Sequence, residues 1–128
     1  GLNEQYFGSW EGKVVDTLRE HPEFKQLIKD PTNYKAQANG GETFEQLGER
    51  AMKALQDIIK IHDQGNILIV SHGHTLRLLL ALLNGATWQN HRDEDKSVSL
   101  INTSISVVHY DDENGFRIEK INDADHLK

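Results

Sequence analysis

The feature that most constrains the fold of this chain is a short apolar run followed by a turn and a leucine-rich segment. Residues 67–70 are all β-branched or leucine residues and are bounded by glycines, which is typical of a short strand buried on both faces. After Gly73 the chain continues as a leucine-rich stretch that ends at Asn84-Gly85, which predicts a buried helix. The sequence therefore predicts a strand, a tight turn and a helix in succession.

His72 lies at the predicted turn, at the carboxyl end of the predicted strand. Open α/β sheets place their ligands at this end of the strands. The N-terminus of the following helix offers unpaired N–H groups and a positive dipole end, which favour an anion such as phosphate. The local pattern leaves two interpretations of His72 open, a catalytic residue and a core histidine.

Composition narrows the class of protein. With 128 residues, of which 37% are hydrophobic and 27% charged, the chain is expected to form one soluble domain over residues 1–128. Its longest apolar run, residues 78–83, is far shorter than the roughly 20 residues that span a bilayer. The net charge of −6 argues against a nucleic-acid or anionic-membrane partner. The absence of cysteine excludes disulfides and thiol catalysis and fits a reducing, cytoplasmic location.

The sequence before the central unit predicts helices and loops. Residues 1–12 are expected to form a structured loop, and residues 13–30 two short amphipathic helices, the second beginning near Pro22. A long polar loop follows over residues 30–41. Thr43 and Gln46 form a predicted capping box at the start of the longest helix, whose apolar face is expected to pack on a sheet.

The sequence after the central unit predicts a β-hairpin. Residues 97–110 alternate as a strand does, with a break around residues 102–104. Residues 111–115 form a predicted hairpin turn, and residues 116–121 the return strand. Such a hairpin is common at the edge of an otherwise parallel sheet.

Three local features are candidates for chemistry. Glu4 is flanked by apolar side chains, which would raise its pKa and suit it to proton transfer, although a solvated loop acid has the same local pattern. His72-Gly73-His74 is a weak metal pair, because no further ligand lies near it in sequence. Ser71 lacks the Gly-x-Ser-x-Gly setting of a nucleophilic serine.

Five short motifs occur in order along nearly the whole chain. They are Leu2-Asn3-Glu4-Gln5-Tyr6-Phe7-Gly8-Ser9-Trp10-Glu11-Gly12, Gly40-Gly41-Glu42-Thr43, Val70-Ser71-His72-Gly73 with Arg77, Asn102-Thr103-Ser104, and Asn122-Asp123 with His126-Leu127. In their order and spacing they resemble the motifs of the histidine phosphatase superfamily, the phosphoglycerate mutase-like family. This resemblance implies an α/β fold, a three-layer α/β/α sandwich whose mostly parallel sheet carries an antiparallel C-terminal edge hairpin, incomplete at the N-terminus.

The resemblance also implies a chemistry. In this family a histidine of an Arg-His-Gly motif attacks phosphorus, and water then resolves the phosphohistidine. Carried over to this chain, Glu4 is the proton donor and His72 the second histidine, which hydrogen-bonds the transferring phosphoryl group. The backbone at Gly73 and the side chain of Asn102 are further expected phosphate contacts. The implied partner is a small phosphate ester, with no metal or other cofactor.

This chain departs from the family pattern because it contains no Arg-His-Gly. The family places that motif upstream of the loop that carries the glutamate, with a further phosphate-binding arginine between them. We therefore expect the nucleophile and both arginines to lie in a preceding part of the domain, and this chain alone to be inactive. The loss of central strands would also leave exposed sheet edges, through which a homo-oligomer could form.

The length and sequence of the region after the Glu4 loop indicate the branch of the family. Residues 12–40 are short where the mutase branch usually carries a long insertion, and Trp10-Glu11-Gly12 resembles the phosphatase branch. A phosphomonoester phosphatase is therefore favoured. A phosphoglycerate mutase and a non-catalytic phosphate-binding module are the alternatives.

Overall fold

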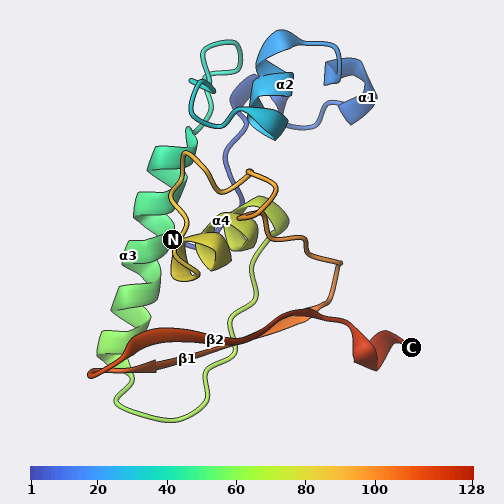
Figure 1. Ribbon diagram of the computed structural model, residues 1–128. Helices are drawn as coiled ribbons and strands as arrows, with labels where there is room; N and C mark the ends of the chain where they lie inside the picture. The colour runs from blue at the N-terminus through green and yellow to red at the C-terminus, as the bar shows by residue number, and fades with distance from the viewer.

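Helices make up most of the ordered elements, and one β-hairpin forms the sheet (Figure 1). The computed structural model describes all of residues 1–128. No helix is long and apolar enough to cross a membrane. The elements are the 3-10 helix η1 (Gly8–Trp10), α1 (Val15–Leu18), α2 (Pro22–Lys29), α3 (Phe44–Ile61), α4 (Gly73–Leu83), β1 (Ile105–Asp111), β2 (Gly115–Asp123) and the 3-10 helix η2 (Asp125–Leu127).

The longest helix, α3, begins where the capping box predicts. The Thr43 side chain accepts a hydrogen bond from the Gln46 N–H at 3.3 Å, and the Gln46 side chain accepts one from the Thr43 N–H at 3.0 Å. The apolar face of α3 is buried, as expected, but it packs against α4 and not on a sheet. The capping residues are thus correctly predicted, whereas the packing partner is not.

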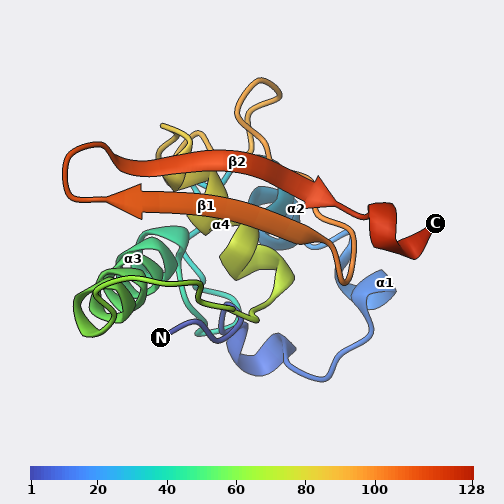
Figure 2. The same ribbon diagram turned by 90° about the horizontal axis from the view of Figure 1, so that it is seen from below.

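The helix α4 forms the centre of the core and confirms the predicted buried helix. It lies between α3 and the hairpin (Figures 1 and 2). Its Leu78 belongs to the apolar cluster around Phe44 and Leu47, while Leu80 lies in a cluster onto which the hairpin packs. Burial on several sides explains why α4 is leucine-rich around most of its circumference.

The predicted hairpin is confirmed. β1 and β2 pair antiparallel, and the Asp111 side chain accepts hydrogen bonds from the N–H groups of Glu113 and Asn114 at 3.0 and 2.7 Å, which closes the turn. Residues 97–104, expected as the first part of the strand, form no strand. The hairpin contacts the core through Val108 and Ile121.

The two predicted short helices are present as α1 and α2, and α2 begins at Pro22. Together with the loop 30–41 they form the end of the molecule farthest from the hairpin (Figure 1). Trp10 and Tyr34 are buried in the cluster that joins this end to α3. The aromatic residues of these loops therefore anchor them to the core.

The prediction of a doubly buried strand at residues 67–70 is wrong for this structure. The segment is extended but belongs to no strand, and the backbone of residues 63–71 makes no backbone hydrogen bond. Leu68 is 89% exposed and Val70 83% exposed, whereas Ile69 packs on the core. The physical reason is that a strand needs a neighbour for its ladder, and no segment among these residues pairs with its backbone; Leu2 only accepts a hydrogen bond from the Ser71 hydroxyl at 2.6 Å.

The expected three-layer sandwich with a mostly parallel sheet is not confirmed, because the only sheet formed by these residues is one antiparallel hairpin. The architecture is α/β and consists of helices packed against one antiparallel hairpin. The segment that leads from α3 to α4 runs apart from the hairpin (Figure 2). It delivers His72 to the start of α4 without the support of a sheet.

Candidate active site

The Glu4 carboxylate is bound to the first turn of α4. Its Oε2 accepts a hydrogen bond from the His74 N–H at 3.1 Å, and its Oε1 accepts one from the Thr75 N–H at 3.0 Å. The Thr75 hydroxyl adds a bond to the carbonyl oxygen of Asn3 at 2.7 Å. The amides and the positive end of the helix dipole stabilise a negative charge at this point. Two parts of the chain that are 70 residues apart in sequence therefore meet at one carboxylate.

The pKa of Glu4 is lowered from its ordinary value of 4.5. Burial acts to raise this pKa, but the backbone N–H groups of Gln5, His74 and Thr75 outweigh it by hydrogen-bonding the charged form. The expectation of a raised pKa is therefore wrong, because the carboxylate faces amides and not apolar side chains. At neutral pH Glu4 is ionised and is poised to accept a proton.

Glu4 also takes up most of the backbone N–H donors that we expected to bind an anion at the start of α4. The N–H groups of His74 and Thr75 are bonded to Glu4, and that of Leu76 is bonded to the carbonyl oxygen of His72 at 2.8 Å. The Gly73 N–H donates no hydrogen bond. Gly73 is thus the one backbone donor of this turn that is free for a ligand.

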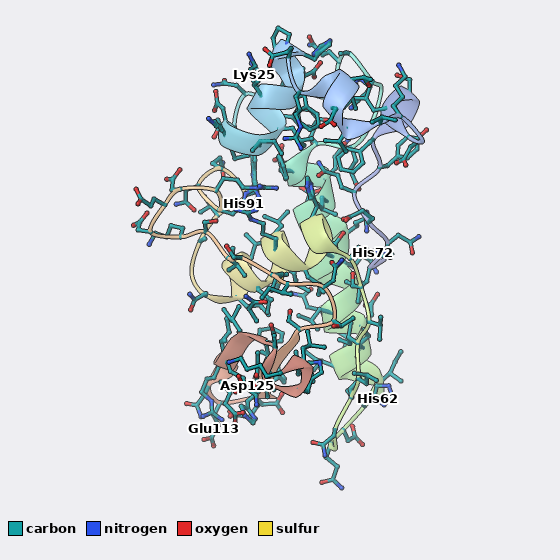
Figure 3. The ribbon with its side chains drawn as sticks, turned by 90° about the vertical axis from the view of Figure 1, so that its right-hand side faces the viewer. Lys25, His62, His72, His91, Glu113 and Asp125 are labelled. Atoms are coloured by element: carbon teal, nitrogen blue, oxygen red, sulfur yellow. The ribbon has the colours of Figure 1, made fainter.

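His72 is the N-cap residue of α4, with an extended backbone at φ −130° and ψ 166°. Its imidazole is exposed and makes no capping hydrogen bond. Figure 3 shows it beside the extended segment that leads into α4. Within these 128 residues the imidazole is therefore not part of the apolar core. The structure therefore brings His72, Gly73 and Glu4 together at one helix terminus.

Asn102 is not joined to these residues. It lies in an exposed turn before β1, and its side chain makes no hydrogen bond. The turn is tied to the hairpin, because the Ile101 N–H donates to the Asn122 side chain at 2.7 Å. Thr103 has a positive φ of 64°, which marks the sharp change of chain direction here.

His74 lies in a different environment from His72. Its Nδ1 is 2.9 Å from the side-chain oxygen of Gln5, and its ring meets Phe7 edge-on and lies nearly parallel to Phe44. Burial, with help from nearby Arg92, lowers the pKa of His74 to about 4. The neutral imidazole of His74 is a packing residue behind Glu4.

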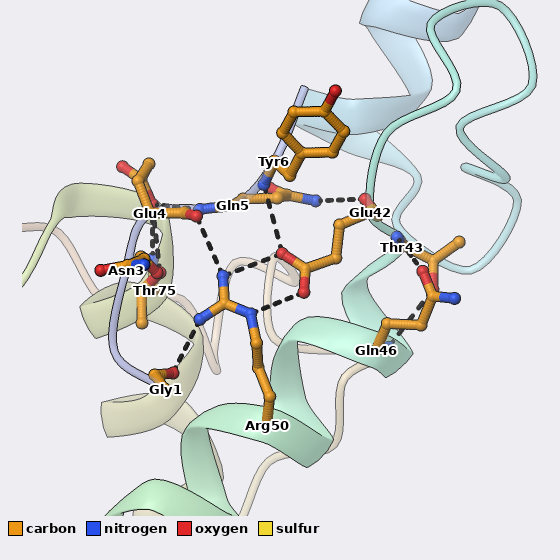
Figure 4. A network of polar contacts seen from close by, with 10 residues as sticks. All are labelled: Gly1, Asn3, Glu4, Gln5, Tyr6, Glu42, Thr43, Gln46, Arg50 and Thr75. Carbon is orange, nitrogen blue, oxygen red and sulfur yellow. Dashed lines mark hydrogen bonds and ion pairs between the residues drawn. The ribbon is translucent and has the colours of Figure 1, made fainter. Parts of the chain in front are cut away.

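An arginine of α3 holds the Glu4 loop in place (Figure 4). Arg50 donates to the carbonyl oxygens of Gly1 and Glu4 at 2.7 and 2.9 Å. Its Nε and Nη2 also donate to the two carboxylate oxygens of Glu42 at 2.6 and 2.9 Å. Gln5 adds a bond from its side-chain nitrogen to the Glu42 carbonyl oxygen at 3.0 Å. The planar guanidinium thus joins the loop, the Gly-Gly-Glu motif and α3.

We expect Arg50→Ala to destabilise the chain by about 2–3 kcal/mol, because it leaves the half-buried Glu42 carboxylate unpaired and frees the Glu4 loop. Chemical denaturation followed by circular dichroism measures this. The matched control is Lys53→Ala on the same helix, which removes an exposed ion pair with Asp57 and should cost about 0.5 kcal/mol or less. Equal losses of unfolding free energy in the two variants would contradict the role of Arg50 in holding the Glu4 loop.

Sequence reasoning missed Arg50 and Thr75. Arg50 lies in α3 eight residues after Glu42, which precedes the Thr43 N-cap, so an acid just before a helix and an arginine in its second turn were the only signal for this pair. Thr75 has no comparable signal, because its partner is a loop carboxylate distant in sequence.

Comparisons with known proteins agree with this arrangement. The family model described as "Histidine phosphatase superfamily (branch 1)" matches residues 1–124 of this chain. The chain belongs to the histidine phosphatase superfamily. A metal-independent phosphoserine phosphatase of Arabidopsis thaliana is 30% identical over 127 residues, which cover 98% of this chain and 50% of that protein. A probable phosphoglycerate mutase GpmB of Salmonella paratyphi B is 29% identical over 133 residues, covering 98% of this chain and 59% of that protein.

The solved structure of Bacillus stearothermophilus YhfR is similar in fold to this histidine phosphatase superfamily member. It superposes with a TM-score of 0.85 at 28% identity, over 98% of this chain and 60% of that chain. The chain thus spans between half and about three fifths of the length of the proteins it matches. Its helices and hairpin are arranged as in the corresponding part of that fold.

Proposed function

We propose that this chain carries the proton-transfer residue and part of the phosphate site of a phosphomonoester phosphatase that works through a phosphohistidine. The observation that supports this most is the Glu4 carboxylate held at the start of α4, next to His72 and Gly73. Membership of the superfamily and the phosphatase name of a relative support the same reaction class. The substrate is a small phosphate ester.

The reaction consists of two displacements on phosphorus. In the first, a histidine nitrogen outside these residues bonds to phosphorus as the ester P–O bond breaks, and protonated Glu4 gives its proton to the leaving oxygen. In the second, a water oxygen bonds to phosphorus as the P–N bond breaks, and Glu4 takes a proton from that water. The carboxyl group therefore returns to its starting state in each cycle.

Glu4 must hold a proton in the first step although its pKa is lowered in the chain. A bound phosphate ester brings negative charge next to the carboxylate, and like charges at close range raise the pKa of a carboxyl group. We therefore propose that Glu4 takes up its proton when the substrate binds.

His72 and Gly73 have complementary roles in this proposal. The exposed His72 imidazole donates a hydrogen bond to a phosphoryl oxygen, and the free Gly73 N–H donates another. Preformed donors of this kind stabilise the charge on the equatorial oxygens in the transition state. Asn102 is proposed as a further phosphate contact, although these 128 residues leave it in an exposed turn apart from His72 and Gly73.

The nucleophile is proposed to come from polypeptide outside these 128 residues, because they contain no Arg-His-Gly. The unpaired, exposed segment 66–71 supports this, since its backbone groups are free to pair with a further strand. Where no such strand is supplied, the same edge is proposed to pair with a second copy of the chain.

Two other functions remain as alternatives to hydrolysis. A phosphoglycerate mutase would transfer the phosphoryl group to a second hydroxyl and not to water, and a relative with that name supports it. A phosphate-binding module without a nucleophile would bind phosphate esters and release none. The short segment between residues 12 and 40 favours the phosphatase.

The choice is tested with the protein extended upstream to include an Arg-His-Gly strand. We expect it to release inorganic phosphate from phosphoserine or an aryl phosphate, and not to interconvert 3- and 2-phosphoglycerate faster than it hydrolyses them. Faster interconversion would establish the mutase. If the extended protein catalyses neither reaction, the phosphate-binding module is the remaining function.

A further inference from the structure

Two of the five arginines have no acidic partner, and they lie next to each other in the interior. Arg19, Arg50 and Arg117 pair with Asp16, Glu42 and Asp111. Arg77 of α4 and Arg92 of the following loop are partly buried and form no ion pair. In a chain with 20 acidic and 14 basic residues, the lack of a carboxylate at this one place is notable.

The donor atoms of this pair are largely unused. The Nη2 of Arg77 donates to the Ser97 hydroxyl at 2.6 Å, but its Nε is buried without a partner. The Nε and Nη2 of Arg92 are also buried without partners, while its guanidinium carbon lies 6.0 Å from the centre of the Phe44 ring. Buried guanidinium groups are normally hydrogen-bonded to acceptors.

His91 lies beside the two arginines as a neutral ring whose Nδ1–H donates to a carbonyl, so it brings no carboxylate or other negative charge to this place. It is 1% exposed, and its Nδ1 is 2.8 Å from the Trp88 carbonyl oxygen, while its Nε2 is buried without a partner. The positive charges are close enough to affect one another. Burial and the charge of Arg77 lower the pKa of Arg92 to about 10. Burial lowers the pKa of His91 to about 4, and Arg92, Arg77 and His74 contribute to that lowering.

We propose that Arg77 and Arg92, with the neutral His91 beside them, form a binding site for a compact oxyanion such as sulfate or phosphate. Such an anion would accept hydrogen bonds from both guanidinium groups and neutralise two adjacent positive charges. This site borders the first turn of α4, because the Phe44 ring lies against His91 and Arg92 as well as His74. Figure 3 shows that His91 and His72 are nevertheless apart from each other. Binding of a free oxyanion does not depend on the phosphatase function, whereas binding of an acidic group of the substrate rests on it.

The test is a sulfate titration of the 128-residue chain, followed by calorimetry and by the thermal unfolding midpoint. We expect saturable binding and a rising midpoint. Arg92→Gln and Arg77→Gln should each weaken binding by about tenfold or more, as expected for the loss of a charged hydrogen bond. The matched control Arg117→Gln, an exposed arginine, should bind as the parent does. Arg92→Lys keeps the charge and serves if the glutamine variant does not fold.

The location of the anion is decided by His72→Ala. Saturable sulfate binding that persists in this variant supports the proposal, whereas loss of binding in His72→Ala together with full binding in Arg92→Gln and Arg77→Gln overturns it. Absence of saturable binding to the parent chain also overturns it. The titration is repeated on the upstream-extended protein. Loss of sulfate binding there would mean that an acidic side chain of the added segment occupies the site, and this result would contradict an anion site.

The occupant can be a free anion or an acidic group of the substrate, and the extended protein separates these two sources. Arg92→Gln should raise KM for a carboxylated aryl phosphate, but not for phenyl phosphate, if the substrate supplies the oxyanion. If Arg92→Gln leaves the KM of both esters at the parent values while sulfate binding is lost, the site binds a free oxyanion.

Discussion

In a complete enzyme that includes this chain, Glu4→Gln is expected to lower kcat by about 10²–10⁴-fold, the usual contribution of a positioned general acid–base group. KM should change little, because the proton is transferred only as the ester bond breaks. Glutamine still offers an oxygen to the α4 amides, but it can neither give nor take the proton. Steady-state hydrolysis of an aryl phosphate measures both constants.

The control for this variant is Glu11→Gln. Glu11 lies in the same loop, lines the same surface hollow as Glu4, and accepts one hydrogen bond from the Phe7 N–H at 2.9 Å. It should keep the parent kcat. A Glu4→Gln enzyme with parent turnover would remove Glu4 from the proton-transfer role, and an equal loss in both variants would indicate damage to the loop.

His72→Ala is expected to lower kcat by about 10²–10³-fold, the usual cost of removing one preformed donor to the transition-state charge. The variant is informative because the His72 side chain is exposed and does not cap α4, so the free energy of unfolding should change by less than about 0.5 kcal/mol. His62→Ala, at the exposed C-cap of α3, is the matched control and should be fully active. Parent turnover in His72→Ala would show that the histidine has no part in catalysis.

The correctly predicted parts of the fold depend on signals between residues close in sequence. The capping box of Thr43 and Gln46, the start of α2 at Pro22 and the turn at Asp111 each arise within a few residues. The position of His72 directly before α4 is also local. These features form whatever the rest of the chain does, and so a short stretch of sequence predicts them.

The wrong predictions concern partners that are distant in sequence. Residues 67–70 have the composition of a buried strand, but a strand exists only where a neighbour completes its ladder. The apolar residues around Glu4 indicated a raised pKa, whereas the N–H of Gln5 and two amides some 70 residues later lower it. The unpaired state of Arg92 is likewise visible only once α3, α4 and the loop after α4 are placed together.

The most direct test of the central claim compares hydrolysis of an aryl phosphate, in EDTA, by two proteins. One is the 128-residue chain, and the other is the same chain extended upstream through an Arg-His-Gly strand. The account predicts turnover by the extended protein only, because the chain supplies Glu4 and His72 but contains no Arg-His-Gly nucleophile. Turnover by the chain alone, or by neither protein, would contradict it.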